Sequence, residues 1–248
     1  MANRISFWEE VSAYTSQMAS LWHGNAGDAL RSLIRKNNPK NICADFGCGP
    51  GYWLEALAFA HKLYAVGFSS NMLDQAKERA PIQTEFLQQN LSELSLPNPV
   101  DFALRFNAIM PEGHADALQI FRRLCGAMAE GGTLIVVVPA FDALIYSANA
   151  VHFHEADQGR EEVSLRERLD TWSAWYSNPL GYVRNGNDTI VKYWLREEFE
   201  AVVQMVGGMS VADYIRLDRV KNTTGENPPE GCAPSWYHCW VLKNYGAG

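Results

Sequence analysis

The sequence predicts an α/β fold, in which a parallel sheet carries helices on both of its faces. Two observations support this prediction. Short apolar runs alternate with helix-like segments between residues 41 and 140. The run Thr133–Pro139 is also unbroken and rich in β-branched residues, which is typical of a parallel strand buried on both sides. Ligands of such sheets bind beyond the carboxyl ends of the strands, so we expect the functional site there.

The expected elements follow one another along the chain. A first strand ends at Asp45 and leads into a glycine-rich turn and then a helical pattern. Further strands are expected at residues 62–68, 84–90, 100–107 and 133–139, and a helix is expected to open at residues 69–76. Residues 209–220 and 236–244 are expected to form a long hairpin near the end of the chain.

The turn after the first strand has the spacing Asp45-x-Gly47-x-Gly49-x-Gly51. Glycine allows the backbone to turn tightly and to lie against a ligand, and a following helix would offer unpaired N–H groups. The spacing differs from that of the dinucleotide fingerprint and from that of the P-loop, whose lysine is missing. The stretch from residue 44 to residue 51 resembles motif I of the class I S-adenosylmethionine-dependent methyltransferases, position for position.

This resemblance implies a Rossmann-like sheet of seven mostly parallel strands, with S-adenosylmethionine as the cofactor. Specific motifs of the family are matched over residues 40–140, and the rest of the chain matches only the general order of the family's elements. The resemblance also implies that Asn90 accepts a hydrogen bond from the adenine amino group and that Leu91 packs on the ring. By position, the expected cofactor-binding residues are Asp45, Gly47, Cys48, Gly49, Gly51, Gly67, Phe68, Ser69, Met72, Asn90, Leu91 and Asn107.

One position departs from the family pattern. In the family, the second strand normally ends in an acidic residue whose carboxylate accepts hydrogen bonds from both ribose hydroxyls. Aligning this chain with the family on residues 69–73 places Gly67 at the acidic position. Aligning it instead on the glycine within the second strand implies a turn that is two residues shorter than in the family. Neither alignment places a carboxylate at this position. Either Ser69, Ser70 or a bridging water replaces this carboxylate, or the fold serves another ligand or none.

Composition and charge exclude several classes of protein. The net charge of -7 leaves no basic stripe for a phosphate backbone, so nucleic acid is not an expected substrate. No run approaches the roughly 20 apolar residues of a membrane helix, and Arg4, Glu9 and Glu10 interrupt the N-terminus. The protein is therefore expected in the cytoplasm, away from membranes. The five cysteines are scattered without a C-x-x-C pair, which predicts reduced thiols and no metal site.

Two segments lie outside the alternation of strands and helices, within what we expect to be a single methyltransferase-like domain spanning residues 1–248. Residues 1–38 form an N-terminal arm with an amphipathic helical pattern from Phe7 to Met18 and a second one from Leu30. Residues 141–193 are rich in aromatic side chains and follow the fifth strand at the ligand-binding edge, so we expect a cap over the site. A helical pattern covers residues 159–176, and residues 185–188 have the composition of a hairpin tip.

Methyl transfer from a sulfonium requires the protein to align the acceptor in a dry pocket, and to supply a base where the acceptor carries a proton. His152 and His154 are expected to provide this base, because the pKa of histidine lies near neutral pH. Arg105, which shares a strand face with Asn107, is expected to orient an anionic substrate. The expected substrate contacts are Tyr14, Arg105, Trp175 and Tyr176.

The leading function is S-adenosylmethionine-dependent methyl transfer to a small molecule. The alternatives are a non-catalytic binding protein of the same fold, and an enzyme that uses a sulfonium ligand for other chemistry. The sequence does not predict an oligomeric state.

Overall fold

A computed structural model of the 248-residue chain describes residues 22, 24–37, 41–107, 113–159, 181–184, 190–218 and 236–246. Seven strands form one sheet in the order β3-β2-β1-β4-β5-β9-β8. The strands are β1 (Ile42–Phe46), β2 (Lys62–Gly67), β3 (Thr84–Gln88), β4 (Val100–Phe106), β5 (Met128–Pro139), β8 (Ser210–Asp218) and β9 (Trp236–Lys243). The first five pair in parallel, and β9 is antiparallel to both of its neighbours. The predicted mostly parallel sheet of seven strands is therefore confirmed.

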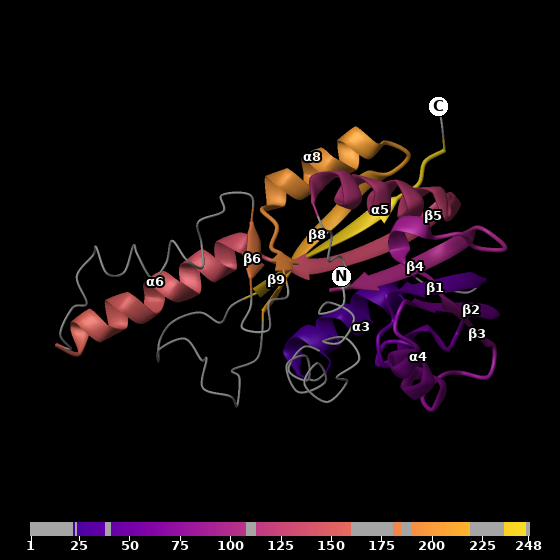
Figure 1. Cartoon of the computed structure of the whole chain (residues 1–248), viewed down its shortest axis with the longest axis horizontal. Helices are drawn as coiled ribbons and strands as arrows, with labels where there is room; N and C mark the ends of the chain where they lie inside the picture. The colour runs from indigo at the N-terminus through magenta and orange to yellow at the C-terminus, as the bar shows by residue number, and fades with distance from the viewer. Residues whose placement is uncertain are drawn as a thin grey trace.

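Helices cover both faces of this sheet (Figure 1). Helices α3 (Asn25–Asn37) and α4 (Ser70–Lys77) lie on one face, and α5 (His114–Gly126) and α8 (Arg196–Val206) lie on the other. Each face has its own apolar core, the first built with leucines of α3 and α4, the second with phenylalanines of α5 and α8. The α3 helix confirms the second helical pattern of the predicted arm, whereas the first pattern lies outside the described residues.

The strand register places the carboxyl ends of β1 to β4 at one edge of the sheet. Phe46 at the end of β1 pairs with Val66 on β2. Gly67 at the end of β2 pairs with Gln88 at the end of β3. On the other side, Phe106 at the end of β4 pairs with Val137 on β5. The residues that follow these strands therefore meet at the edge where the ligand is expected.

The segment after β5 begins at the same edge. Helix α6 (Phe141–Asp157) starts directly beyond β5 and projects away from the sheet (Figure 1). The short strands β6 (Tyr182–Arg184) and β7 (Ile190–Lys192) form an antiparallel hairpin. Trp194 then returns to the end of β5, where its N–H donates to the Pro139 carbonyl at 2.9 Å. This bond holds the hairpin against the start of α6.

One local prediction is wrong. No α-helix follows the glycine turn: residues 52–60 form turns around a 3₁₀ helix, η1 (Glu55–Leu57). Only fifteen residues, 47–61, separate β1 from β2, and consecutive bonds between residues three apart take up this short connection. The cap over residues 141–193 stays a prediction, and its first part forms α6, a helix that the sequence did not predict because its apolar residues are not confined to one face. Strands β6 and β7 pair with each other, whereas the predicted hairpin tip at residues 185–188 and residues 160–176 of the predicted cap helix lie outside the described residues.

Candidate active site

The glycine turn has the backbone conformation that its sequence requires. Gly47, Gly49 and Gly51 all have positive φ values, of 79°, 51° and 84°. Residues with a side chain rarely adopt this region, so the turn depends on glycine at these positions. The N–H groups of Gly47 and Cys48 both donate to the Val66 carbonyl, at 2.8 and 2.9 Å. These two bonds fix the turn against the end of β2.

Helix α4 and the residues that follow it pack against the glycine turn. A Cβ atom on Gly51 would lie 2.9 Å from the Cα atom of Ala76, so this glycine allows the close approach of the turn to the helix. Arg79 donates to the Pro50 carbonyl at 3.2 Å, and its guanidinium lies 4.9 Å from the centroid of the Tyr52 ring. Tyr52 stacks in turn on Trp22, with ring centroids 3.6 Å apart. These contacts hold the turn in one shape before any ligand binds.

Asp45 is the ionisable group beneath this turn. Its side chain is buried, and its Oδ2 atom has no hydrogen-bond partner among the described residues. Burial raises the pKa of Asp45 to about 7. A ligand that brings a cationic donor to this carboxylate would satisfy the unpaired oxygen. S-adenosylmethionine carries such a group in its α-ammonium, so the residues present fit the implied cofactor.

We expect the raised pKa of Asp45 to make the cofactor-free protein less stable as the pH rises. The folded state keeps a proton that the unfolded state releases, from the ordinary carboxyl pKa of about 4 to the folded value of about 7. Stability should therefore fall through this window by up to about 1.4 kcal/mol per pH unit. Asp45→Asn removes the ionisation and should flatten this dependence. Urea unfolding of both proteins between pH 5 and 8 measures it, and parallel curves would contradict the assignment.

Cys48, inside the turn, is not an activated thiol. It is buried, and burial together with the nearby Asp45 carboxylate raises the pKa of its thiol well above the ordinary value. Cys48 therefore acts as a small residue of the turn.

The end of β2 contains the position that departs from the family pattern. Ser69 is the N-cap of α4, and its hydroxyl accepts a hydrogen bond from the Met72 N–H at 3.2 Å. Gly67 lies two residues before this cap and carries no side chain. Ser69 and Met72 are buried, whereas Phe68 is 44% exposed at the strand edge, where it can cover one side of a flat ring.

The end of β3 is organised by a second cap. The Asn90 side chain accepts from the Ser92 N–H at 3.2 Å and begins the 3₁₀ helix η2 (Leu91–Glu93). Asn90 itself is exposed, and Leu91 is buried. The carbonyl oxygen of an amide has a second lone pair, so capping still leaves Asn90 able to accept from an adenine amino group.

The end of β4 differs in detail from the prediction. Asn107 follows the last residue of β4 and has a φ of 46°, so strand alternation does not extend to it. Its N–H donates to the Val137 carbonyl at 2.9 Å, and asparagine tolerates this left-handed conformation well. Arg105 is fully buried in β4, between Leu104 and Phe106, which belong to the core under α3 and α4. By alternation it faces α5 and α8, and contact with a substrate stays a prediction.

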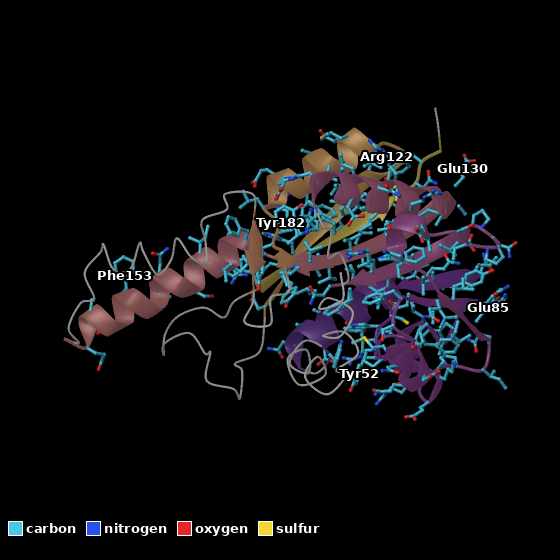
Figure 2. All side chains as sticks on the ribbon, viewed as in Figure 1. Tyr52, Glu85, Arg122, Glu130, Phe153 and Tyr182 are labelled. Carbon is cyan, nitrogen blue, oxygen red and sulfur yellow. The ribbon has the colours of Figure 1, made fainter. Side chains whose placement is uncertain are left out.

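Several predicted residues cannot be placed. Tyr14, Trp175 and Tyr176 lie outside the described residues. His152 and His154 belong to α6, but their side chains are not described. Figure 2 shows that Phe153, between them, lies far out on this helix, whereas Tyr182 lies where the helix leaves the sheet.

The ranges of residues that the structure describes show neither a metal site nor a membrane-spanning helix. They contain no group of three or more His, Cys, Asp or Glu side chains placed to hold a metal ion. None of the helices in these ranges is long and apolar enough to cross a membrane.

Sequence reasoning missed two sets of residues at this edge. Arg79 and Tyr52 support the glycine turn, and no motif points to them. The Lys192 ammonium is buried and contacts Glu198 at 2.7 Å, which links the hairpin to α8. A lysine is ordinarily expected in solvent, so only the fold reveals this pair.

Comparisons with known proteins agree with this fold. A family model described as a methyltransferase domain matches residues 43–132, which contain the glycine turn and the ends of β1 to β4. A solved structure described as a DhpI–SAH complex has the same fold, with a TM-score of 0.63 at 14% identity. It covers 99% of this chain and 97% of the matched chain. Fold, turn and family model define a class I S-adenosylmethionine-dependent methyltransferase.

Similar sequences narrow the family. A protein of Afipia carboxidovorans named trans-aconitate 2-methyltransferase is 32% identical over 183 residues, 69% of this chain and 69% of that protein. A protein of the same name from Rhodopseudomonas palustris is 29% identical over 197 residues, 75% of this chain and 74% of its own length. The chain therefore belongs to this methyltransferase family and uses S-adenosylmethionine as its cofactor. The predicted activity and cofactor are confirmed.

Proposed function

We propose that this methyltransferase transfers the methyl group to a carboxylate of a small polycarboxylic acid of the trans-aconitate type. The observation that carries the proposal is the similarity to two proteins named trans-aconitate 2-methyltransferase. The net charge of -7 favours a small acceptor over a nucleic acid, because a polyanionic backbone would be repelled. The same charge also slows the approach of an anionic substrate, so local basic groups must draw it in.

The residues of this chain contribute to the reaction by positioning the cofactor and the acceptor. When bound, S-adenosylmethionine supplies an activated methyl group on its sulfonium. In this proposal the glycine turn and Asp45 bind the cofactor, and Asn107, which follows β4 next to β1 in the sheet, contacts the methionine part or the acceptor. Arg105, Tyr14, Trp175 and Tyr176 are the substrate contacts that we propose. Alignment and exclusion of water account for most of the acceleration that such a transfer needs.

A direct assay tests the acceptor. The protein is incubated with S-adenosylmethionine and trans-aconitate, cis-aconitate, citrate, a monocarboxylic acid or a simple amine, and the products are analysed by mass spectrometry. We expect one methyl group to be added to an aconitate, as an ester that mild alkali removes. Methylation of the amine alone would overturn the carboxylate proposal.

The acceptor also decides whether His152 and His154 are needed as bases. A carboxylate with a pKa of about 4 is already ionised at neutral pH, whereas a hydroxyl or a protonated amine must lose a proton. With trans-aconitate, we expect the double variant His152→Ala/His154→Ala to keep the rate and the pH profile of the wild type between pH 6.5 and 8. A loss on the order of a hundredfold or more would instead identify a catalytic base and a protonated acceptor.

We further propose that residues 141–193 act as a cap that closes over the acceptor. The support is that α6 starts at the ligand-binding edge and that Trp194 returns the chain to the same edge. Hydrogen exchange of residues 141–159 and 181–193 should slow when S-adenosylhomocysteine and trans-aconitate are added together. Peptides of β5, buried in the sheet, serve as the reference, and equal exchange with and without ligands would contradict a cap.

A further inference from the structure

The end of β2 lacks a carboxylate, although the cofactor presents two ribose hydroxyls to this part of the fold. Gly67 occupies the position two residues before the Ser69 cap. The nearest acidic residue along the chain, Asp74, is exposed and bound to Lys77 at 2.7 Å. Glu85 lies further down β3 and contacts Lys62 at 3.0 Å. Neither Asp74 nor Glu85 stands at the end of β2, so neither replaces the family's carboxylate there.

Gln88 is placed to do so. It is the last residue of β3 and pairs directly with Gly67. In parallel strands, paired residues project on the same face, so the Gln88 side chain rises beside the bare Gly67 backbone. Gln88 is exposed at this edge, which leaves its amide accessible to a ligand.

The orientation of the Gln88 amide is set by the protein. Its Nε2 atom donates to the Phe68 carbonyl at 3.1 Å, across the strand end that the ribose must approach. With Nε2 engaged, the amide oxygen Oε1 is the group left to accept, and no described residue donates to it. An amide held in one orientation loses less entropy on binding a ligand than a freely rotating one.

We propose that Oε1 of Gln88 accepts a hydrogen bond from a ribose hydroxyl of S-adenosylmethionine, in place of the family's carboxylate at the end of β2. Ser69 is a weaker candidate, because its hydroxyl is buried and caps α4. Ser70 is exposed at the start of α4 and has no such orienting bond, so it serves as a rival in the test. This inference depends on the cofactor and not on the acceptor, so failure of the carboxylate proposal leaves it intact.

The test compares S-adenosylhomocysteine with its 2′-deoxy and 3′-deoxy analogues, by calorimetric titration of the wild-type protein and of Gln88→Ala. A neutral hydrogen bond contributes about 0.5–1.5 kcal/mol net, which corresponds to a two- to tenfold change in affinity. We expect Gln88→Ala to weaken S-adenosylhomocysteine by this factor. We also expect that removing the contacted hydroxyl weakens wild-type binding equally and leaves Gln88→Ala binding unchanged. A purely structural role of Gln88 would not produce this dependence on one hydroxyl.

Two control variants accompany the test. Gln83 lies just before the amino end of β3, away from the carboxyl ends of the strands. There its amide donates to the Ala58 and Ala60 carbonyls at 2.9 Å. Gln83→Ala should keep the full hydroxyl dependence of the wild type. Ser70→Ala should keep it as well. The proposal is overturned if Gln88→Ala retains the wild-type sensitivity to both hydroxyls, or if that sensitivity disappears in Ser70→Ala instead.

Discussion

Replacing Gly67 by aspartate is expected to tighten S-adenosylhomocysteine binding on the order of tenfold to a thousandfold. The new carboxylate would stand at the position where the family places its ribose acid. Hydrogen bonds to a charged group contribute about 1.5–3 kcal/mol each, and the cost of burying the charge offsets part of one or two such bonds. Calorimetric titration of the variant and of the wild type measures the change.

The structure indicates that this substitution can be accommodated. Gly67 is not among the glycines with positive φ, so aspartate meets no backbone strain there. A Cβ atom would lie 3.2 Å from Cδ2 of Leu73 and 3.7 Å from Sγ of Cys48. The Leu73 methyl group is the flexible end of a side chain and can move by the few tenths of an ångström required.

Gly67→Asn is the matched control, because it fills the same space without a charge. We expect it to gain at most a few-fold in affinity, since neutral hydrogen bonds contribute less than charged ones. If Gly67→Asp and Gly67→Asn bind alike, the gain comes from shape and the ribose does not lie at this position. In the Gly67→Asp background, Gln88→Ala should lose its effect, because the carboxylate then receives the hydroxyls.

The sequence predicts the framework of this site well because its signals are local. Ser69 before an apolar helical pattern predicts the start of α4, and the structure shows its hydroxyl on the Met72 N–H. The apolar run ending at Pro139 predicts a strand buried on both faces, and β5 lies in the sheet between β4 and β9. Such patterns reflect burial of a strand or capping of a helix, which depend on neighbouring residues.

The contacts that the sequence did not reveal depend on register or on distant parts of the chain. The proposed role of Gln88 depends on its pairing with Gly67. A shift of the strand register by one residue would point the Gln88 side chain to the other face of the sheet. Helix α6 lacks an amphipathic pattern, so its residues suggested an irregular cap. The prediction of a helix after Gly51 is wrong because the short connection to β2 folds into 3₁₀ turns. The stack of Tyr52 on Trp22 joins two separate segments, and no spacing rule foresees it.

Removing the Glu198 carboxylate should cause a large loss of stability at the base of the cap. Lys192 is 1% exposed, and its Nζ atom contacts Glu198 at 2.7 Å and the Tyr193 carbonyl at 2.9 Å. The ammonium also lies 4.7 Å from the Trp194 ring centroid and 5.4 Å from that of Tyr182. Removing one partner of a buried ion pair typically costs about 3–5 kcal/mol, because the burial of the remaining charge is then less well compensated.

We therefore expect Glu198→Ala to lower the melting temperature by roughly 10 °C at neutral pH. Lys192→Met, which removes the charge and keeps much of the apolar stem, should cost far less than Glu198→Ala, and the double variant should resemble Lys192→Met. The pH gives a second test, because burial already lowers the pKa of Lys192 and Glu198 opposes this shift. Without Glu198 that pKa falls further, so the folded state binds fewer protons than the unfolded state and its stability rises with pH. The deficit of Glu198→Ala should thus shrink as the pH rises above neutral, and a constant deficit would show that the buried ammonium is not its cause.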